Sequence, residues 1–221
     1  FNGCQNLSSI TLPKNLKTIG DYVFTDCFQL TDVSIPNGVV TIGNFAFCRC
    51  KALTEIRLPD SVTTIGTGAF SDCEQLESVK LPAGISSINQ SLFEDCKRLN
   101  NVVIPDGVIS IGECAFSDCE NLENITLPGN LETIGFRAFN NCTALKAMTF
   151  PEKLKKLSWE IFAACTNLRE LHFTGSMPTL DEKAFKTAGF VAFYPAKDSS
   201  YADADNCGGN VIWLPEGTAY P

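Results

Sequence analysis

Apolar side chains return to the same positions every 23 residues along most of this chain. The segment 53–75, LTEIRLPDSVTTIGTGAFSDCEQ, shows the unit, and a shift of 23 residues in either direction reproduces its apolar positions. Phenylalanine marks the period at Phe1, Phe24, Phe47, Phe70, Phe93, Phe116, Phe139, Phe162 and Phe185. Cysteine marks it at Cys4, Cys27, Cys50, Cys73, Cys96, Cys119, Cys142 and Cys165. This period predicts a solenoid, in which each unit buries its core only by stacking on its neighbours.

Each unit opens with a short run whose apolar residues come to alternate with polar ones. In the first complete unit the run holds Leu7, Ile10 and Leu12, and Pro13 ends it. Alternation with period two, closed by proline, predicts a strand of about three to five residues. A second short strand is predicted at 16–19, and again at 39–42, 62–65 and 85–88.

Single glycines follow these second strands at Gly20, Gly43, Gly66, Gly112 and Gly135. Because glycine adopts positive φ without a steric penalty, we expect a turn with positive φ at this position of each unit.

The last third of each unit carries apolar residues at spacings typical of a helix. Ala69, Phe70 and Cys73 stand at i, i+1 and i+4, a set that fits one or two helical turns packed on the coil interior. The chain is therefore predicted to be an α/β solenoid, a right-handed coil with short strands and a short helix in each 23-residue repeat.

We expect the repeat array to span residues 1–190, with about eight repeats and an N-terminus that begins within a repeat. The last units lose consensus residues at Ser158, Thr174, Asp181 and Ala188. Such decay is expected where a terminal repeat must shield the open end of the core.

Residues 191–221 do not follow the period and are predicted to form a C-terminal cap. Two strands are expected, at 190–194 and 211–214, joined by a polar loop that contains Gly208 and Gly209. Trp213 is interpreted as an apolar lid on the last coil, with a ligand-stacking tryptophan as the alternative.

The composition restricts the class of partner. The chain has 221 residues, 44% of them hydrophobic, and a net charge of −8, which argues against a nucleic-acid partner. No apolar run reaches the length of a membrane-spanning helix. Because Phe1 already occupies a repeat position and no initiating Met precedes it, we expect the chain to be part of a longer protein.

The eleven cysteines are interpreted as reduced thiols rather than a disulfide framework. Eight occupy one repeat position, so their side chains would run parallel on coils about 4.8 Å apart, an arrangement that does not favour disulfide geometry. Buried thiols behave as small apolar groups. Cys48, Cys114 and Cys207 lie off this ladder, and no cysteine or histidine cluster supplies the four ligands of a structural zinc site.

The consensus unit LxxIxLPxxLxxIGxxAFxxCxx resembles the BspA-type leucine-rich repeat, whose members are many bacterial surface proteins and some proteins of parasitic protists. The resemblance covers residues 1 to about 190, and the C-terminal tail also looks like the usual end of such arrays. It implies a leucine-rich-repeat coil in a secreted or wall-anchored protein that binds host matrix proteins, other bacteria or surface glycans. The family has no shared catalytic residues, and no cofactor is implied.

Two features invite a chemical interpretation. His172 is the only histidine and has no positioned nucleophile in the sequence, so we predict no catalytic role for it. Aspartates precede the ladder cysteines at Asp26, Asp72, Asp95 and Asp118. Stacked carboxylates could bind Ca²⁺, whereas the alternative is a solvated helix end whose short polar side chains bond to local backbone.

The outward positions of the first strands form two columns that vary while the core is constant. Solenoids use such extended faces to bind partners, although surface drift also produces variation. The candidate contact region combines four charged residues and one apolar residue: Asp32, Glu55, Arg57, Lys80 and Val103. Few aromatic residues stand in these columns, which favours a protein partner over a glycan.

These observations predict a non-catalytic adhesion module of a secreted or cell-surface bacterial protein. Its partners would be host matrix proteins or other surface proteins, with glycans as a further possibility. The alternative function is a passive spacer that displays other domains of the parent chain. A spacer should bind nothing itself, whereas a recognition module should lose binding when the charges of its strand face are reversed.

Overall fold

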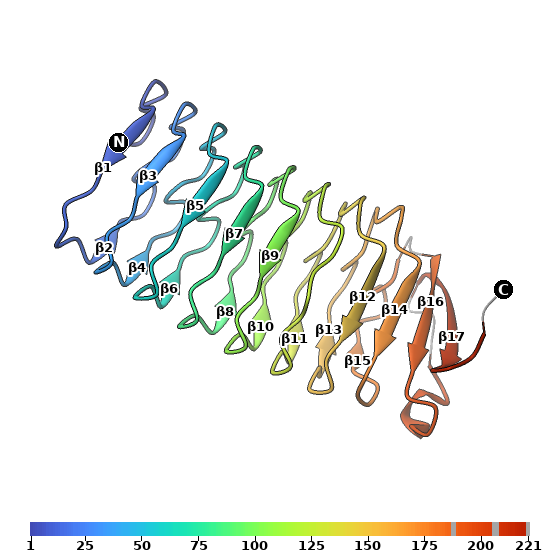
Figure 1. The fold of residues 1–221 in the computed structure, drawn as a ribbon. Helices are drawn as coiled ribbons and strands as arrows, with labels where there is room; N and C mark the ends of the chain where they lie inside the picture. The colour runs from blue at the N-terminus through green and yellow to red at the C-terminus, as the bar shows by residue number, and fades with distance from the viewer. Residues whose placement is uncertain (187–188, 205–207, 220–221) are drawn as a thin grey trace.

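The computed structural model describes residues 1–186, 189–204 and 208–219. These residues form a parallel β-solenoid of about nine turns, which Figure 1 shows as a row of stacked coils with the two termini at opposite ends. The solenoid predicted from the 23-residue period is therefore confirmed.

One side of the solenoid carries the longer strands, which form three parallel sheets. The first sheet contains β1 (Ser9–Thr11) and β3 (Asp32–Ser34). The second contains β5 (Glu55–Arg57), β7 (Ser78–Lys80) and β9 (Asn101–Val103). The third contains β12 (Ala147–Phe150), β14 (Glu170–Phe173), β16 (Gly189–Tyr194) and β17 (Asn210–Pro215).

The other side carries strands of only two residues, shorter than the sequence predicts. One sheet contains β2 (Thr18–Ile19), β4 (Thr41–Ile42) and β6 (Thr64–Ile65). The other contains β8 (Ser87–Ile88), β10 (Ser110–Ile111), β11 (Thr133–Ile134), β13 (Lys156–Leu157) and β15 (Thr179–Leu180).

The core is a column of stacked phenylalanine rings. From Phe1 to Phe162, consecutive ring centroids lie 5.2–5.9 Å apart and their planes differ by 3–21°. The rings from Phe24 onward are almost completely buried, whereas Phe1 is 61% exposed. Repetition at a fixed period thus produces one continuous apolar core.

The cysteine ladder lies beside this column and has a specific partner. The Sγ of Cys73 donates to the carbonyl oxygen of Phe47 at 3.2 Å, and the Sγ of Cys96 donates to that of Phe70 at 3.1 Å. The cysteines of the described residues are free thiols, and burial raises the pKa of Cys73 well above its ordinary value. A thiol fits this position because it is small, apolar and able to donate a weak hydrogen bond.

The predicted short helix in each repeat is wrong. No α-helix occurs in the described part of the chain, and the 3-10 turn η1 (Ser199–Tyr201) lies outside the repeats. Residues four apart in each coil, such as Gly68 and Asp72, have φ of 59° and 57°, and a right-handed helix cannot continue through them. Their segment directs its N–H groups to the next coil, as where Phe70 donates to the carbonyl oxygen of Leu92 at 3.1 Å.

The glycines after the short strands do not have positive φ, so that prediction is also wrong. A Cβ added to Gly66 would lie 2.5 Å from the backbone nitrogen of Asn44, and one added to Gly43 would lie 2.6 Å from that of Asp21. Glycine is needed here because the backbone of the preceding coil comes too close for any side chain.

The strands predicted near the C-terminus are confirmed as β16 and β17, which extend the third sheet with a spacing of 21 residues. Glu170 pairs with Val191, and Gly189 pairs with Asn210. The ring of Trp213 packs against Phe173, with a centroid distance of 5.5 Å. The division into an array at 1–190 and a cap at 191–221 stays a prediction, and Ala188 and Cys207 lie outside the described residues.

Candidate functional site

The strand face, meaning the outward side chains of β1, β3, β5, β7, β9, residues 124–126, β12 and β14, is the surface on which the sequence places the candidate contact region. In β3, β5, β7 and β9 the burial alternates as exposed, buried, exposed. Val33, Ile56, Val79 and Val102 fill the inward slots. Period-two alternation therefore holds the neighbouring side chains out in solvent.

Four of the five predicted contact residues lie together on one sheet. Arg57, Lys80 and Val103 are consecutive partners in the register of β5, β7 and β9. Glu55 lies on the same strand as Arg57 and pairs with it at 3.6 Å. Asp32 stands on β3, which lies next to β5 but belongs to a different sheet.

The charged residues of this region are available to a partner. The side chains of Arg57 and Glu55 are 88% and 64% exposed, and so open an ion pair contributes little to stability. Val103 is 61% exposed, which is unusual for a branched apolar side chain. An exposed apolar residue beside weakly engaged charges is a suitable contact for a protein partner.

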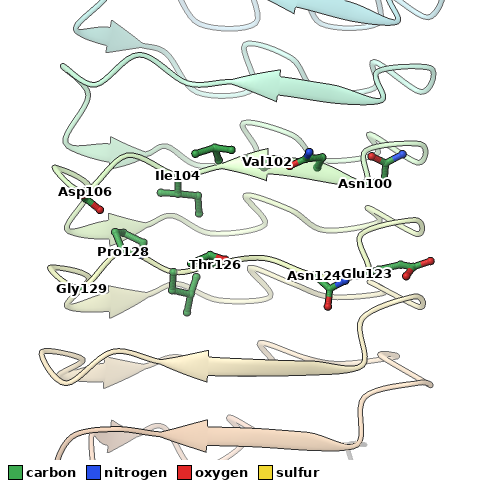
Figure 2. Close-up of a pocket in the computed structure, with 12 residues that line it drawn as sticks. Asn100, Val102, Ile104, Asp106, Glu123, Asn124, Thr126, Pro128 and Gly129 are labelled. Atoms are coloured by element: carbon green, nitrogen blue, oxygen red, sulfur yellow. The ribbon is translucent and has the colours of Figure 1, made fainter.

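Sequence reasoning missed a groove on this face, which Figure 2 shows in close-up. It has a volume of about 860 Å³ and lies between the coil of β9 and the following coil. We name it the asparagine groove, and six of the residues that line it are Asn100, Asn101, Val103, Asp106, Glu123 and Asn124. Val103 belongs to both the groove and the predicted contact region.

The asparagine groove lies where the sheet is interrupted. β9 ends its sheet, and the next coil is joined to it by an isolated bridge between Val103 and Thr126. Asn100 donates its backbone N–H to Glu77 at 3.1 Å, but among the described residues no corresponding bond joins Glu123 to Asn100. The coil at 122–128 keeps the usual Leu, Ile, Leu and Pro, so nothing in the repeat pattern predicts this break.

The aspartates that precede the ladder cysteines do not end a helix. Asp26, Asp72, Asp95 and Asp118 all have φ between 57° and 61°, a conformation that Asp and Asn tolerate better than most residues. Burial, and then the charges of Asp118 and Asp72, raise the pKa of Asp95. Across the described ranges, no group of three or more potential metal ligands is close enough to hold an ion.

His172 lies between two carboxylates at the C-terminal end of the strand face. Its Nε2 is 3.4 Å from Glu170 and its Nδ1 is 3.5 Å from Glu216. The imidazole stacks on Phe193 with a centroid distance of 4.9 Å. The Sγ of Cys165, the nearest ladder cysteine in the sequence, donates to the carbonyl oxygen of Phe139 at 2.9 Å.

Stacked coils with one strand, one ladder cysteine and one buried phenylalanine each define a leucine-rich-repeat solenoid. The family model described as "BspA type Leucine rich repeat region" matches residues 1–100 and 86–194, with six copies. The chain belongs to this family, and the resemblance seen in the sequence is confirmed.

Solved structures of bacterial leucine-rich-repeat proteins have the same fold. A protein from Bacteroides ovatus is 25% identical with a TM-score of 0.77, covering 97% of this chain and 62% of that one. A leucine rich cell surface protein from Faecalibacterium prausnitzii is 25% identical with a TM-score of 0.56, covering 99% and 62%. The T. pallidum leucine rich repeat protein is 30% identical with a TM-score of 0.60, covering 84% and 73%.

The chain thus spans less than two thirds of the first two of these proteins. No curated protein matches its sequence. Within the part of the chain that the structure describes, no helix is long and apolar enough to cross a membrane.

Proposed function

We propose that this chain is a non-catalytic recognition module of a secreted or cell-surface bacterial protein. It binds host matrix proteins or other surface proteins through the strand face, with Asp32, Glu55, Arg57, Lys80 and Val103 as the contact region. Membership of the BspA-type family and likeness to a protein described as a cell surface protein support this location.

The observation that carries the proposal is the alignment of Arg57, Lys80 and Val103 on adjacent strands of one sheet. The core residues behind them barely vary between repeats, whereas these three positions present a guanidinium, an ammonium and an apolar group. A rigid sheet that presents different side chains at a constant spacing suits the recognition of a protein surface.

A solid-phase binding screen of the 221-residue chain against host matrix proteins and a glycan array tests this function. The double variant Arg57→Glu with Lys80→Glu should lose a protein partner that the unmodified chain binds. The control Lys14→Glu with Lys17→Glu makes the same change in net charge at exposed positions away from the contact region, and should bind normally.

Three results would contradict the proposal in different ways. Binding that survives Arg57→Glu with Lys80→Glu would remove the contact region from the strand face. Binding to glycans alone would replace the protein partner. No binding in either screen would favour the spacer function.

A further inference from the structure

We propose that the asparagine groove binds an extended, basic segment of the partner protein. This inference rests on the proposed function and specifies the chemistry of the segment that reaches the strand face. It concerns residues that are absent from the predicted contact region, apart from Val103.

The groove has the shape of an extended peptide. It follows β9 from Asn100 at one end to Asp106 at the other (Figure 2). At about 3.3 Å per residue, this stretch of strand is roughly 20 Å long and accommodates about five or six residues of extended chain.

The side-chain carboxamides of Asn100, Asn101 and Asn124 have no hydrogen-bond partner among the described residues. Other asparagines bond within the solenoid, as Asn89 does to the carbonyl oxygen of Ile65 at 2.6 Å. A carboxamide offers both donors and an acceptor, so it can bond the N–H and the C=O of a peptide backbone. Three of them lining one groove can therefore hold an extended chain independently of its sequence.

The charge of the groove selects basic side chains. Asp106 and Glu123 contribute carboxylates, and no lysine or arginine lines the groove. Glu123 pairs with Lys146 at 3.3 Å, but both side chains are more than half exposed, so a partner's cation can join or replace this pair. No described group pairs with the carboxylate of Asp106. The net charge of −8 adds a long-range attraction for a basic segment.

Val103 provides the apolar contact between the two carboxylates. Successive side chains of an extended segment point to opposite sides, so an apolar residue can lie on Val103 while basic residues reach toward the ends of the groove. No aromatic ring lines the groove, although such rings are the usual stacking partners of sugars. This lining favours a peptide over a neutral glycan.

A positional-scanning library of acetylated, amidated hexapeptides, titrated into the isotopically labelled 221-residue chain, tests the inference by NMR. We expect enrichment of lysine or arginine at two positions and shifts of amide signals in residues 100–106 and 123–129. Binding should weaken as the salt concentration rises, because exposed charges are screened.

The variant Asp106→Asn with Glu123→Gln should bind the selected peptide at least about tenfold more weakly, since both carboxylates are removed and their charge pairs lost. The matched control is Asp60→Asn with Glu77→Gln, which changes the same two repeat positions two coils earlier. Glu77 also pairs with a basic residue, Arg98, at 3.7 Å. The control should bind as the unmodified chain does, and thermal unfolding should show that both variants fold.

The inference is overturned if acidic or neutral peptides are selected, if the shifts lie elsewhere, or if a neutral oligosaccharide occupies the groove instead. Its failure is distinct from failure of the proposed function. A matrix protein whose binding is lost in Arg57→Glu with Lys80→Glu but retained in Asp106→Asn with Glu123→Gln would keep the function and exclude the groove.

Discussion

At the scale of single residues, each repeat position selects its side chain by what the neighbouring coil places opposite it. Gly66 faces backbone atoms of Gly43 and Asn44, with 2.5 Å between an added Cβ and the Asn44 nitrogen. Gly20 occupies the same repeat position, but an added Cβ would meet no atom within 4 Å. The same residue type is thus a packing requirement in one coil and not in the other.

The substitution Gly66→Ala should lower the free energy of unfolding by about 2–3 kcal/mol, the size expected when a close-packed site is overfilled. Gly20→Ala should change it by less than about 0.5 kcal/mol, as at an open surface site. Urea unfolding of both variants measures the difference. Equal effects would mean that the approach of the preceding coil does not determine the glycine.

The ladder thiols should resist modification in the folded protein. Burial raises the pKa of Cys73, Cys119 and Cys142 well above the ordinary value, so little thiolate forms, whereas Cys4 is exposed. Iodoacetamide at pH 8 followed by peptide mass spectrometry should find Cys4 modified and these three unmodified. Rapid modification of Cys119 in the native state would contradict the burial of the ladder.

High pH should destabilise the fold through the same thiols. Burial raises the pKa of Cys48 to about 11, from an ordinary value of 9.0. Between these values the unfolded chain loses a proton that the folded chain keeps, so the stabilisation is complete below pH 9 and is lost as the pH rises toward 11. Relative to Cys48→Ala, the unmodified chain should lose unfolding free energy between pH 9 and 11. A constant difference would exclude this titration.

At the scale of the elements, the turn segment is distinguished from a helix by its left-handed residues. Ala164 has a φ of 59°, at the repeat position that holds Asp or Asn in most coils. Ala163, its neighbour, is not among the residues with positive φ. Adjacent alanines therefore differ in backbone conformation, which allows a direct test.

Replacing Ala164 by glycine should stabilise the protein by about 0.5–1 kcal/mol, because the left-handed conformation penalises alanine but not glycine. Replacing Ala163 by glycine should destabilise it by about 0.5–1 kcal/mol, since only chain entropy changes there. Thermal unfolding of the two variants gives the signs. A stabilising Ala163→Gly with a destabilising Ala164→Gly would restore a helical segment.

At the scale of the whole molecule, what could be predicted depends on whether it lies within one coil or between coils. The strands, the phenylalanine column and the cysteine ladder follow from the period, because residues 23 apart occupy the same place in successive coils. The helix prediction failed because Ala69, Phe70 and Cys73 have spacings that fit a helix or a pair of turns equally well. Asp72 was the available signal, since aspartate favours the left-handed conformation.

The exposed contact residues could be predicted from the alternation of the strands, but the asparagine groove could not. Residues 100–106 and 123–129 follow the same repeat pattern, and the interruption is a change in how two coils meet. The close approach behind Gly43 and Gly66 is also a distance between coils. Such distances have no marker in the sequence of one repeat.

The stacked architecture makes stability depend on contacts between neighbouring coils. The ring of Phe93 lies 5.8 Å from that of Phe70 and 5.5 Å from that of Phe116, and it is completely buried. Removing this ring opens a cavity on both sides, so Phe93→Ala should lower the free energy of unfolding by about 3–5 kcal/mol. Phe1→Ala should lower it by less than about 1 kcal/mol, because the ring of Phe1 is already 61% exposed.

Because each coil contacts only its neighbours, the damage in Phe93→Ala should also be local before the chain unfolds. Hydrogen exchange should accelerate first in the backbone amides of the coils that contain Phe70, Phe93 and Phe116, while amides of β12 and β14 keep their protection. A uniform acceleration along the chain would mean that the solenoid opens as one cooperative unit. A loss of stability below about 1 kcal/mol would mean that the ring is not part of the core, since filled core sites give larger values.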